Sequence, residues 1–300
     1  MLAPMPNTEP GRLDYDSPQA LSAALESEGL AMSKRFGQNF LVDRRSRLKI
    51  LAELEAAQGA HVWELGPGLG AMTELALDAG LRVTAFEIDH GFARVLRRIF
   101  GHRPEFRLVE GDFLNTWRAE LSASGPPDRV FGNLPYSVAN AMVAAVLEGG
   151  LAPPRMVFTV QKEAAQRMTA VPGTKDYSAF SVLCASCCRS KIAFDLSGGS
   201  FWPVPRVTSS AVRMVARPDP VCVEDRGGFS TFVRAAFASR RKTLRNNLRA
   251  IGPAAFEALP AVLGSLGIRE DVRAEALRPE ELGAVYRELS PTFNRGRAAR

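Results

Sequence analysis

The feature that most constrains the fold is a regular alternation, from His61 to Val160, between short apolar runs and segments with helical periodicity. Strands that alternate with helices along a chain form βαβ units, in which consecutive strands are parallel. The pattern therefore predicts an α/β fold with a mostly parallel sheet and helices on both faces. We expect strands at His61–Leu65, Arg82–Glu87, Phe106–Glu110, Arg129–Gly132 and Arg155–Val160, and helices at Thr73–Asp78, Gly91–Ile99 and Ala139–Leu147.

The segments before this alternation differ from it in composition. Residues 1–16 are rich in proline and polar side chains, so we expect a disordered N-terminal extension. Ser17 followed by Pro18 is typical of an N-cap and a first helical residue, and a second helix is expected over Arg44–Ala57.

The segments after the alternation predict an edge of the sheet and then a second domain. Three apolar runs, Phe180–Cys188, Lys191–Leu196 and Ser210–Ala216, follow one another without helices, so we expect antiparallel strands. The chain turns helical after the linker at residues 217–220, with helices expected at Phe229–Phe237, Lys242–Leu248, Pro253–Leu263 and Pro279–Glu288. We therefore predict an α/β domain over residues 17–216 and a small all-helical domain over 217–300.

The composition excludes several protein classes. With 46% hydrophobic and 23% charged residues, the chain resembles an ordinary globular protein and neither a disordered nor a fibrous one. No apolar run reaches membrane-spanning length and the N-terminus lacks the pattern of a signal peptide, so we expect a cytoplasmic protein without a membrane partner. The four cysteines have no histidine nearby, which favours reduced thiols and no metal site.

A glycine-rich loop follows the first predicted strand of the sheet. Gly66-Pro67-Gly68-Leu69-Gly70-Ala71 separates that strand from a helix, so its backbone can approach a ligand closely. The loop also fits the dinucleotide fingerprint G-x-G-x-x-A, which keeps a nicotinamide or flavin oxidoreductase as an alternative. Carboxylates at three successive strand ends, Glu64, Glu87 and Asp112, suit a cationic ligand without phosphates. S-adenosylmethionine has a sulfonium, an adenine amino group and no phosphate, so we predict that it is the cofactor.

A second loop, Asn133-Leu134-Pro135-Tyr136, follows the fourth predicted strand. The exocyclic amine of a nucleobase is a poor nucleophile, because its lone pair is delocalised into the ring. The amide oxygen of Asn133 and a backbone carbonyl near Leu134 can accept its two N–H bonds and favour a pyramidal nitrogen. Pro135 stiffens the loop, and Tyr136 offers a ring for base stacking. The tetrapeptide predicts methyl transfer to a base amine, and the oxidoreductase alternative leaves it unexplained.

These motifs and four others resemble the KsgA/RsmA family of ribosomal RNA adenine dimethyltransferases. The further stretches are Lys34–Leu41, Gln161–Glu163, Phe201–Val207 with Ser209 or Ser210, and Phe237–Leu248. The resemblance implies a Rossmann-like S-adenosylmethionine-dependent methyltransferase domain. It also implies dimethylation of N6 on each of two adjacent adenosines near the 3′ end of small-subunit rRNA. Carried over by position, the cofactor site is implied to contain Asn39, Leu41, Gly66, Glu87, Asp112 and Asn133. Phe201 would close over the base opposite Tyr136.

Basic residues are the candidates for RNA contact. The net charge is +6, and five basic residues without an acid fall between positions 240 and 249. Such a cluster attracts polyphosphate chains. The predicted RNA-binding residues are Lys34, Arg35, Arg240, Arg241, Lys242, Arg245 and Arg249. We expect a monomer whose partner is the small ribosomal subunit and its rRNA.

Three alternatives to this function remain open. Erm-type enzymes share the first domain and modify an adenine of large-subunit rRNA, although the Phe201–Val207 and Phe237–Leu248 stretches favour the small-subunit branch. A DNA adenine methyltransferase would use the same tetrapeptide, but we find no separate DNA-reading module. The protein also fits a ribosome-assembly factor that acts mainly by binding.

Overall fold

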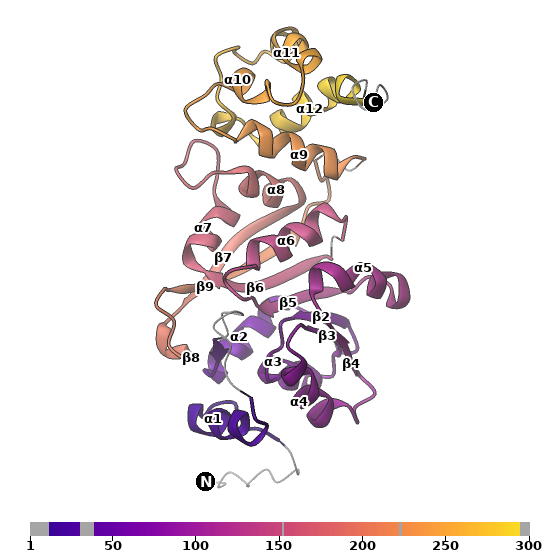
Figure 1. The fold of residues 1–300 in the computed structure, drawn as a ribbon, viewed down its shortest axis with the longest axis vertical. Coiled ribbons are helices and arrows are strands. Elements are labelled where there is room, and N and C mark those ends of the chain that lie inside the picture. The colour runs from indigo at the N-terminus through magenta and orange to yellow at the C-terminus, as the bar shows by residue number, and fades with distance from the viewer. Residues whose placement is uncertain (1–11, 31–38, 152, 222–223, 295–300) are drawn as a thin grey trace. The chain divides into compact units, whose positions relative to one another are not determined.

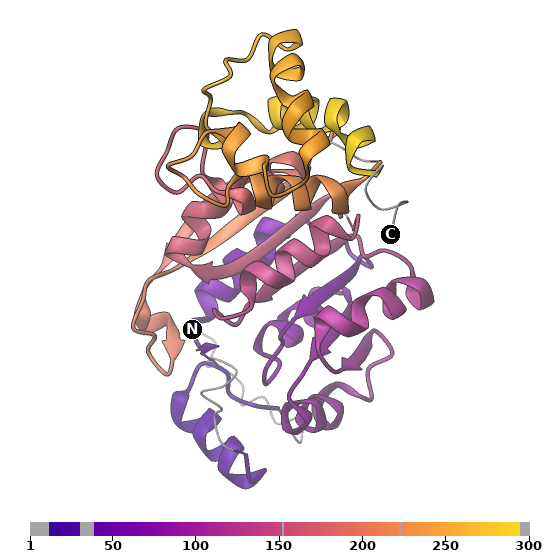
Figure 2. The same cartoon turned by 45° about the horizontal axis from the view of Figure 1, so that its top comes forward.

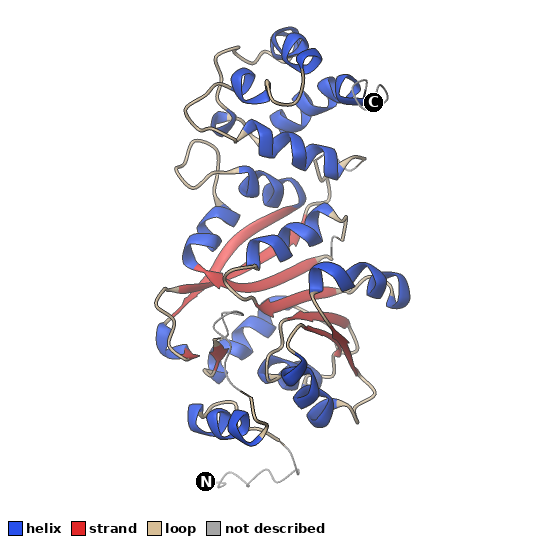
Figure 3. Ribbon diagram, in the orientation of Figure 1, coloured by secondary structure: helices blue, strands red, loops and turns tan. Residues whose placement is uncertain are grey.

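The computed structural model describes residues 12–30, 39–151, 153–221 and 224–294. The chain forms two compact units (Figure 1). The first comprises Met1–Ala139, Arg155–Gln161 and Ala193–Ala211, and the second comprises Asn140–Pro154, Lys162–Ile192 and Val212–Arg300. Figure 3 distinguishes their helices and strands by colour.

The described residues form twelve α-helices and nine strands. The helices are α1 Pro18–Ser27, α2 Arg44–Leu54, α3 Ala71–Asp78, α4 His90–Phe100, α5 Phe113–Ser124, α6 Ala139–Glu148, α7 Lys162–Thr169, α8 Ala179–Cys187, α9 Arg226–Ala236, α10 Leu244–Leu248, α11 Pro253–Ser265 and α12 Pro279–Asn294. The strands are β1 Phe40–Leu41, β2 His61–Leu65, β3 Arg82–Glu87, β4 Phe106–Glu110, β5 Arg129–Asn133, β6 Arg155–Gln161, β7 Cys188–Leu196, β8 Phe201–Trp202 and β9 Ser209–Ala216.

The main sheet has seven strands in the order β4-β3-β2-β5-β6-β9-β7. The four pairs from β4 to β6 are parallel, with Glu64 opposite Ala85 and Phe131, and Glu87 opposite Glu110. This confirms the predicted parallel sheet, and β9 with β7 makes it a mixed sheet. The short strands β1 and β8 pair antiparallel in a separate two-stranded sheet.

Helices of the first unit cover both faces of its part of the sheet. Successive strand residues point to opposite faces, so each strand contributes side chains to the packing on both. Val62 and Val83 point to the face whose hydrophobic cluster includes side chains of α3 and α4. Trp63 and Phe86 lie on the other face, where Phe86 contacts Phe113 of α5 at a ring-centroid distance of 5.1 Å. Figure 2 gives a second view of this arrangement.

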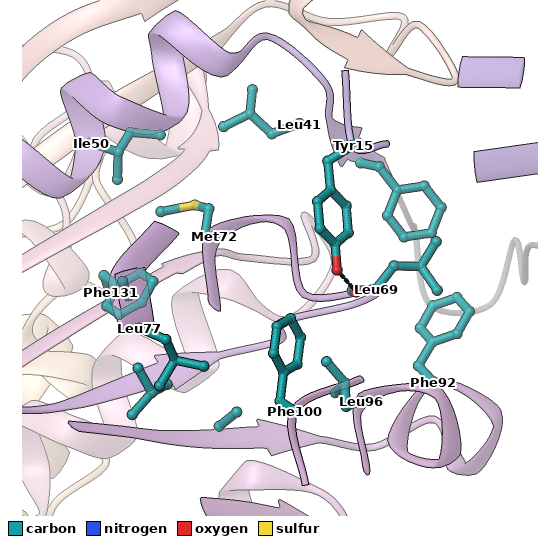
Figure 4. Close-up of a cluster of buried hydrophobic side chains, with 14 of the residues drawn as sticks. Tyr15, Leu41, Ile50, Leu69, Met72, Leu77, Phe92, Leu96, Phe100 and Phe131 are labelled. Atoms are coloured by element: carbon teal, nitrogen blue, oxygen red, sulfur yellow. Dashed lines mark hydrogen bonds between the residues drawn. The ribbon is translucent and has the colours of Figure 1, made fainter. Parts of the chain in front are cut away.

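The hydrophobic core of the first unit extends to the N-terminal segment. Figure 4 shows Tyr15 among Leu69, Phe92 and other buried side chains, and Tyr15 is 3% exposed. Most of the segment predicted to be disordered, residues 1–11, lies outside the described residues. Within the described remainder, Tyr15 packs on the core, because its ring is apolar and its hydroxyl donates to the carbonyl of Leu69.

The second unit has its own core, built mainly by α8 to α12. Phe229, Phe232, Leu282 and Tyr286 are buried there, and the four helices expected beyond residue 217 are present as α9 to α12. The division into domains at residues 216 and 217 stays a prediction, since the second compact unit also includes α6, α7 and α8.

The prediction of a strand at Phe180–Cys188 is wrong, because this run forms helix α8. A short, continuously apolar run has no period that separates a buried strand from a buried helix. The helix begins at a capping box: Ser178 Oγ accepts the Ser181 N–H, and Ser181 Oγ accepts the Ser178 N–H at 3.0 Å. Helices α5 and α7 were also not predicted.

Candidate functional site

The glycine-rich loop connects β2 to α3 and can be built only with glycine at its tightest point. Gly70 has φ +95°, and a Cβ atom there would lie 2.4 Å from the Phe100 ring. A Cβ at Gly68 would lie 3.2 Å from the ring of Phe40, at φ +60°. The loop backbone therefore lies close to the rings of Phe40 and Phe100, which leave little room for a side chain at Gly68 and none at Gly70.

Glu87, at the end of β3, is bonded to this loop. Gly68 N–H donates to its Oε2 at 3.0 Å, and Asp89 N–H donates to its Oε1 at 2.9 Å. Burial raises the pKa of Glu87 to about 7, because desolvation outweighs these two hydrogen bonds. The carboxylate oxygens of Glu87 can accept further hydrogen bonds, for example from ribose hydroxyls.

Glu64 has a different environment from Glu87. Its side chain is completely buried and accepts a hydrogen bond of 2.6 Å from Thr73 Oγ1 of α3. Burial raises its pKa to about 8. The carboxyl group that we expected at the first strand end therefore ties β2 to α3.

Asp112 follows β4, the next strand of the sheet, and caps α5. Its Oδ1 accepts the Leu114 N–H at 2.9 Å, and Gly111 N–H donates to the carbonyl of Glu87 at 2.8 Å. The chain segments that carry Glu87 and Asp112 are thus joined directly, at the carboxyl ends of neighbouring parallel strands. Ligands of open α/β sheets bind at this edge.

Asn133 ends β5 and has a defined amide orientation. Its Nδ2 donates to the backbone carbonyl of Asn39 at 2.7 Å. Because a carbonyl can only accept, the amide NH₂ must face Asn39, and Oδ1 points elsewhere. Oδ1 has no hydrogen-bond partner among the described residues, so it is available to accept one from a ligand.

The loop after Asn133 lies against the glycine-rich loop. A Cβ at Gly132 would lie 2.4 Å from the carbonyl oxygen of Leu65, so only glycine lets β5 approach β2 this closely. Leu134 N–H donates to the Thr159 carbonyl of β6 at 3.0 Å. Pro135 Cδ lies 3.7 Å from the position of a Cβ built on Gly66. The two predicted motifs are therefore neighbours in space.

Tyr136 is half-buried, and its hydroxyl lies 2.5 Å from Ser209 Oγ at the start of β9. Burial raises the pKa of Tyr136, although this hydrogen bond opposes the shift. The bond holds the phenol end of the side chain, which limits the ring to a narrow range of orientations.

Phe201 lies beside the predicted cofactor residue Leu41, since β8 pairs with β1. The Phe201 side chain is 2% exposed and belongs to the core of the first unit. Its neighbour Trp202 stacks on Phe40 with ring centroids 6.1 Å apart. The structure thus brings Leu41 and Phe201 together, while the placement of Phe201 opposite Tyr136 stays a prediction.

The predicted RNA-binding residues differ in their surroundings. Lys34 and Arg35 lie outside the described residues. Arg240 forms a salt bridge of 2.7 Å with Glu275 and donates to the carbonyls of Thr174 and Lys175. It therefore has a structural task within the second unit.

The other members of this cluster are free of carboxylate partners within the described chain. Arg241 and Lys242 are exposed, whereas Arg245 and Arg249 lie over the Phe256 ring at 4.8 and 5.2 Å. Sequence reasoning missed the buried Asn247, which supports their loop. Asn247 Nδ2 donates to the carbonyls of Ala236 and Ser239, at 2.7 and 2.9 Å.

Sequence reasoning also missed Tyr15 and Arg47. The Tyr15 hydroxyl donates to the carbonyl of Leu69, within the glycine-rich loop, at 2.9 Å (Figure 4). Arg47 Nη1 donates to the Ala71 carbonyl at 3.3 Å, and its guanidinium lies 5.9 Å from the Tyr15 ring centroid. An ion pair with Asp16 completes this set of contacts. Neither residue lies in a motif, so only their partners reveal their role.

Two further features are absent from the described residues. No group of three or more His, Cys, Asp or Glu side chains is arranged to hold a metal ion. None of the described helices combines the length and apolar character that crossing a membrane requires.

Comparison with known proteins gives one consistent family. A sequence profile described as "Ribosomal RNA adenine dimethylase" matches residues 29–290. The chain is 43% identical over 268 residues to the "Ribosomal RNA small subunit methyltransferase A" of Treponema denticola, an alignment that covers 88% of this chain and 92% of that one. It is 42% identical over 272 residues to the protein of the same name from Rubrobacter xylanophilus, covering 90% of this chain and 100% of that one.

Two solved structures are similar over most of their length. A dimethyladenosine transferase from Plasmodium falciparum superposes with a TM-score of 0.70 at 20% identity, over 83% of this chain and 96% of that one. The 23S rRNA methyltransferase ErmE superposes with a TM-score of 0.58 at 25% identity, over 83% and 99%. At 20% identity the first likeness concerns the fold alone.

Proposed function

Because the chain belongs to the ribosomal RNA adenine dimethylase family, we propose that Asn133, Leu134, Pro135 and Tyr136 form its catalytic loop. The protein is an S-adenosylmethionine-dependent adenine N6,N6-dimethyltransferase of small-subunit rRNA. The assignment of this loop rests on one observation. The hydrogen bond from Asn133 Nδ2 to the Asn39 carbonyl leaves Oδ1 as a hydrogen-bond acceptor for the target amine.

The residues at the strand ends fit S-adenosylmethionine. The Glu87 carboxylate is buried beside the glycine-rich loop and suits hydroxyl donors, and Asp112 offers a second acceptor on the next strand. We propose that the cofactor is held by Asn39, Leu41, Gly66, Glu87, Asp112 and Asn133. When bound, it supplies an electrophilic methyl group on a positively charged sulfur.

Asn133 and Leu134 have the task of preparing the adenine amine. Asn133 Oδ1 and the Leu134 carbonyl oxygen each accept a hydrogen bond from one N6–H group. This arrangement favours a pyramidal nitrogen, whose lone pair points out of the plane of the ring. Neither group removes a proton beforehand, since a neutral amide and a carbonyl are very weak bases. Once the nitrogen has accepted the methyl group it becomes acidic, and its proton leaves to solvent.

Tyr136 and Phe201 have the task of holding the extruded base. The ring of Tyr136 is fixed by Ser209, and stacking of a base on such a ring contributes about 1–3 kcal/mol. We propose that Phe201, beside Leu41, closes the opposite side. No protein group is consumed, so the same site serves the second methylation of each adenosine after cofactor exchange.

The target and the setting belong to the same proposal. We propose two adjacent adenosines near the 3′ end of the small-subunit rRNA as the target, methylated during subunit maturation in the cytoplasm. All candidate catalytic and cofactor residues come from the first compact unit of one chain, which supports a monomeric enzyme. We propose that Arg241, Lys242, Arg245 and Arg249 of the second unit contact rRNA phosphates, together with Lys34 and Arg35.

The function is tested by offering the protein alternative substrates. Labelled S-adenosylmethionine is incubated separately with unmodified small subunits, with large subunits and with duplex DNA, and the labelled nucleoside is identified by mass. We expect N6,N6-dimethyladenosine in the small subunit. Label in the large subunit would indicate Erm-type activity, label in DNA would indicate a DNA methyltransferase, and association without label would indicate an assembly factor.

A further inference from the structure

One face of α2 is basic, exposed and slightly hollowed. Its residues Arg44, Arg45, Leu48, Lys49 and Ala52 line a shallow depression of about 550 Å³. They recur at the spacing that places side chains on one side of a helix. The opposite side of α2 is buried, with Ile50 and Leu54 completely inaccessible. We call Arg44, Arg45, Leu48 and Lys49 the α2 basic face.

The cations of this face form no ion pair within the described part of the chain, although the nearby charge of Arg45 helps to lower the pKa of the N-cap Asp43, after the hydrogen bond from Ser46. On α4, by contrast, Arg98 pairs with Glu28 at 2.9 Å, Arg94 lies 3.8 Å from the same carboxylate, and Arg97 pairs with Glu110. Lys49 Nζ lies 5.3 Å from the ring centroid of Phe194, which orients its stem without neutralising it. The charge of the α2 basic face is therefore available to an anionic partner.

Positive charge at the start of α2 is also unfavourable for the helix itself. Arg44 and Arg45 occupy the first turn, which contains no acidic residue, although the helix dipole favours acids there. Only the N-cap Asp43 opposes this repulsion, through hydrogen bonds from Arg45 N–H and Ser46 N–H. The stability of α2 therefore does not explain the presence of two arginines in its first turn.

The α2 basic face begins next to the predicted base-holding residue. Val42 N–H and Asp43 N–H donate to the carbonyl of Ser200, at 2.9 and 3.2 Å, and Ser200 directly precedes Phe201. All these residues belong to the first compact unit. An RNA strand that delivers a base to this site carries one phosphate with every flanking nucleotide.

We propose that the α2 basic face binds the sugar–phosphate backbone of the rRNA that flanks the target adenosines. Arg44, Arg45 and Lys49 contact phosphates, and Leu48 packs on a ribose or an unstacked base. This proposal rests on the proposed function, and it adds a contact that the predicted RNA-binding residues do not include.

The test compares two double variants with the same loss of charge. Arg44→Gln with Arg45→Gln removes two unpaired cations of α2, and Arg94→Gln with Arg98→Gln removes two cations of α4 that face Glu28. Affinity for unmodified small subunits is measured between low and moderate salt. Each lost phosphate contact reduces the slope of log K against log salt by about 1. We expect the slope of log K against log salt to be smaller by about 2 for the α2 variant than for the unsubstituted protein. The slope for the α4 variant should equal that of the unsubstituted protein.

Two control measurements separate this proposal from the proposed function. S-adenosylmethionine affinity should be unchanged in the α2 variant, and its melting temperature should be equal or higher, because glutamine keeps the helix propensity of arginine and removes unfavourable charge from the first turn. If the unsubstituted protein does not methylate small subunits, the proposed function fails. If it does, and the α2 variant has the same salt slope and the same KM for subunits, the α2 proposal alone is overturned.

A crosslinking measurement identifies the partner. A photoreactive benzophenone residue replaces Leu48, which is 47% exposed at the centre of the face. On irradiation with unmodified small subunits we expect crosslinks to rRNA near the methylated adenosines. Crosslinks to a ribosomal protein alone would overturn the assignment to the RNA backbone.

Discussion

Asn133 Nδ2 donates a 2.7 Å hydrogen bond to the carbonyl oxygen of Asn39, although the two residues are 94 positions apart in the chain. The bond joins the end of β5 to the residue before β1, and it orients the amide of Asn133. A carboxylate could not make the same bond, since it has no donor. Asn133 is thus suited to its partner Asn39 as well as to the proposed reaction.

We predict that the ring of Tyr136, and not its hydroxyl, holds the target base. Tyr136→Phe removes the bond to Ser209 but keeps the ring, so kcat/KM for small subunits should change by no more than about threefold. Tyr136→Ala removes a stacking contribution of about 1–3 kcal/mol and should lower kcat/KM by roughly 5- to 150-fold. Equal losses in both variants, measured by methyl incorporation, would contradict a stacking role.

We predict that Tyr15 maintains the cofactor loop. Tyr15→Phe leaves the Leu69 carbonyl without its donor, which costs about 0.5–1.5 kcal/mol and should weaken S-adenosylmethionine binding by up to about tenfold. Tyr177→Phe is a matched control, because the Tyr177 hydroxyl donates to the Leu277 carbonyl, also at 2.9 Å, in the second unit. Calorimetry should show unchanged cofactor affinity for the control, even if both variants melt at similar temperatures. Equal affinities would assign Tyr15 to stability alone.

We predict that Glu64 makes the protein less stable as the pH rises. Burial raises its pKa to about 8 in the folded state, whereas an unfolded glutamate titrates near 4.3. Between about pH 5 and 8 the folded state therefore keeps a proton that the unfolded chain has released, so this contribution to stability is lost across that window.

Glu64→Gln imitates the protonated side chain and keeps an acceptor for Thr73. At pH 8 the variant should exceed the unsubstituted protein in free energy of unfolding by an amount on the order of a few kcal/mol. The difference should shrink toward pH 5. Urea unfolding at both pH values measures it, and a difference independent of pH would show that Glu64 is ionised in the folded protein.

We predict that the basic cluster of the second unit divides into structural and RNA-binding members. Arg240→Gln breaks the bonds to Glu275 and to the Thr174 and Lys175 carbonyls, so it should lower the free energy of unfolding by about 1 kcal/mol. Arg241→Gln with Lys242→Gln should leave stability unchanged and reduce the salt slope of subunit binding by about 2. Thermal melts and filter binding distinguish these effects, and a slope equal to that of the unsubstituted protein would exclude phosphate contacts by this pair.

The parallel sheet was predictable from the sequence because its strands alternate with periodic helices and end in recognisable loops. The Gly66–Gly70 and Asn133–Tyr136 loops follow strands β2 and β5, which are neighbours in the sheet, so their proximity follows from topology alone. Helix α8 was not predictable in the same way, since its apolar run has no clear period and its cap uses Ser181 in place of glutamate.

The contacts that support the site were also hidden in the sequence. Tyr15 stands in a polar, proline-rich segment, and its partner Leu69 is 54 positions away. The individual environments of Glu64 and Glu87 were equally hidden, because each glutamate stands at or next to the carboxyl end of an apolar strand. Only the burial of Glu64 beside Thr73 shows that it supports α3.

The most direct test is the transfer of methyl groups by Asn133→Ala, measured in single turnover on unmodified small subunits with cofactor affinity determined in parallel. Removing a preorganised polar group at a reacting centre typically costs about 10²–10³ in rate. We expect a loss of at least this size, with S-adenosylmethionine binding weakened but still measurable, since Asn133 is also one of the proposed cofactor residues. A variant that dimethylates adenosine at the normal rate would show that Asn133 does not prepare the amine.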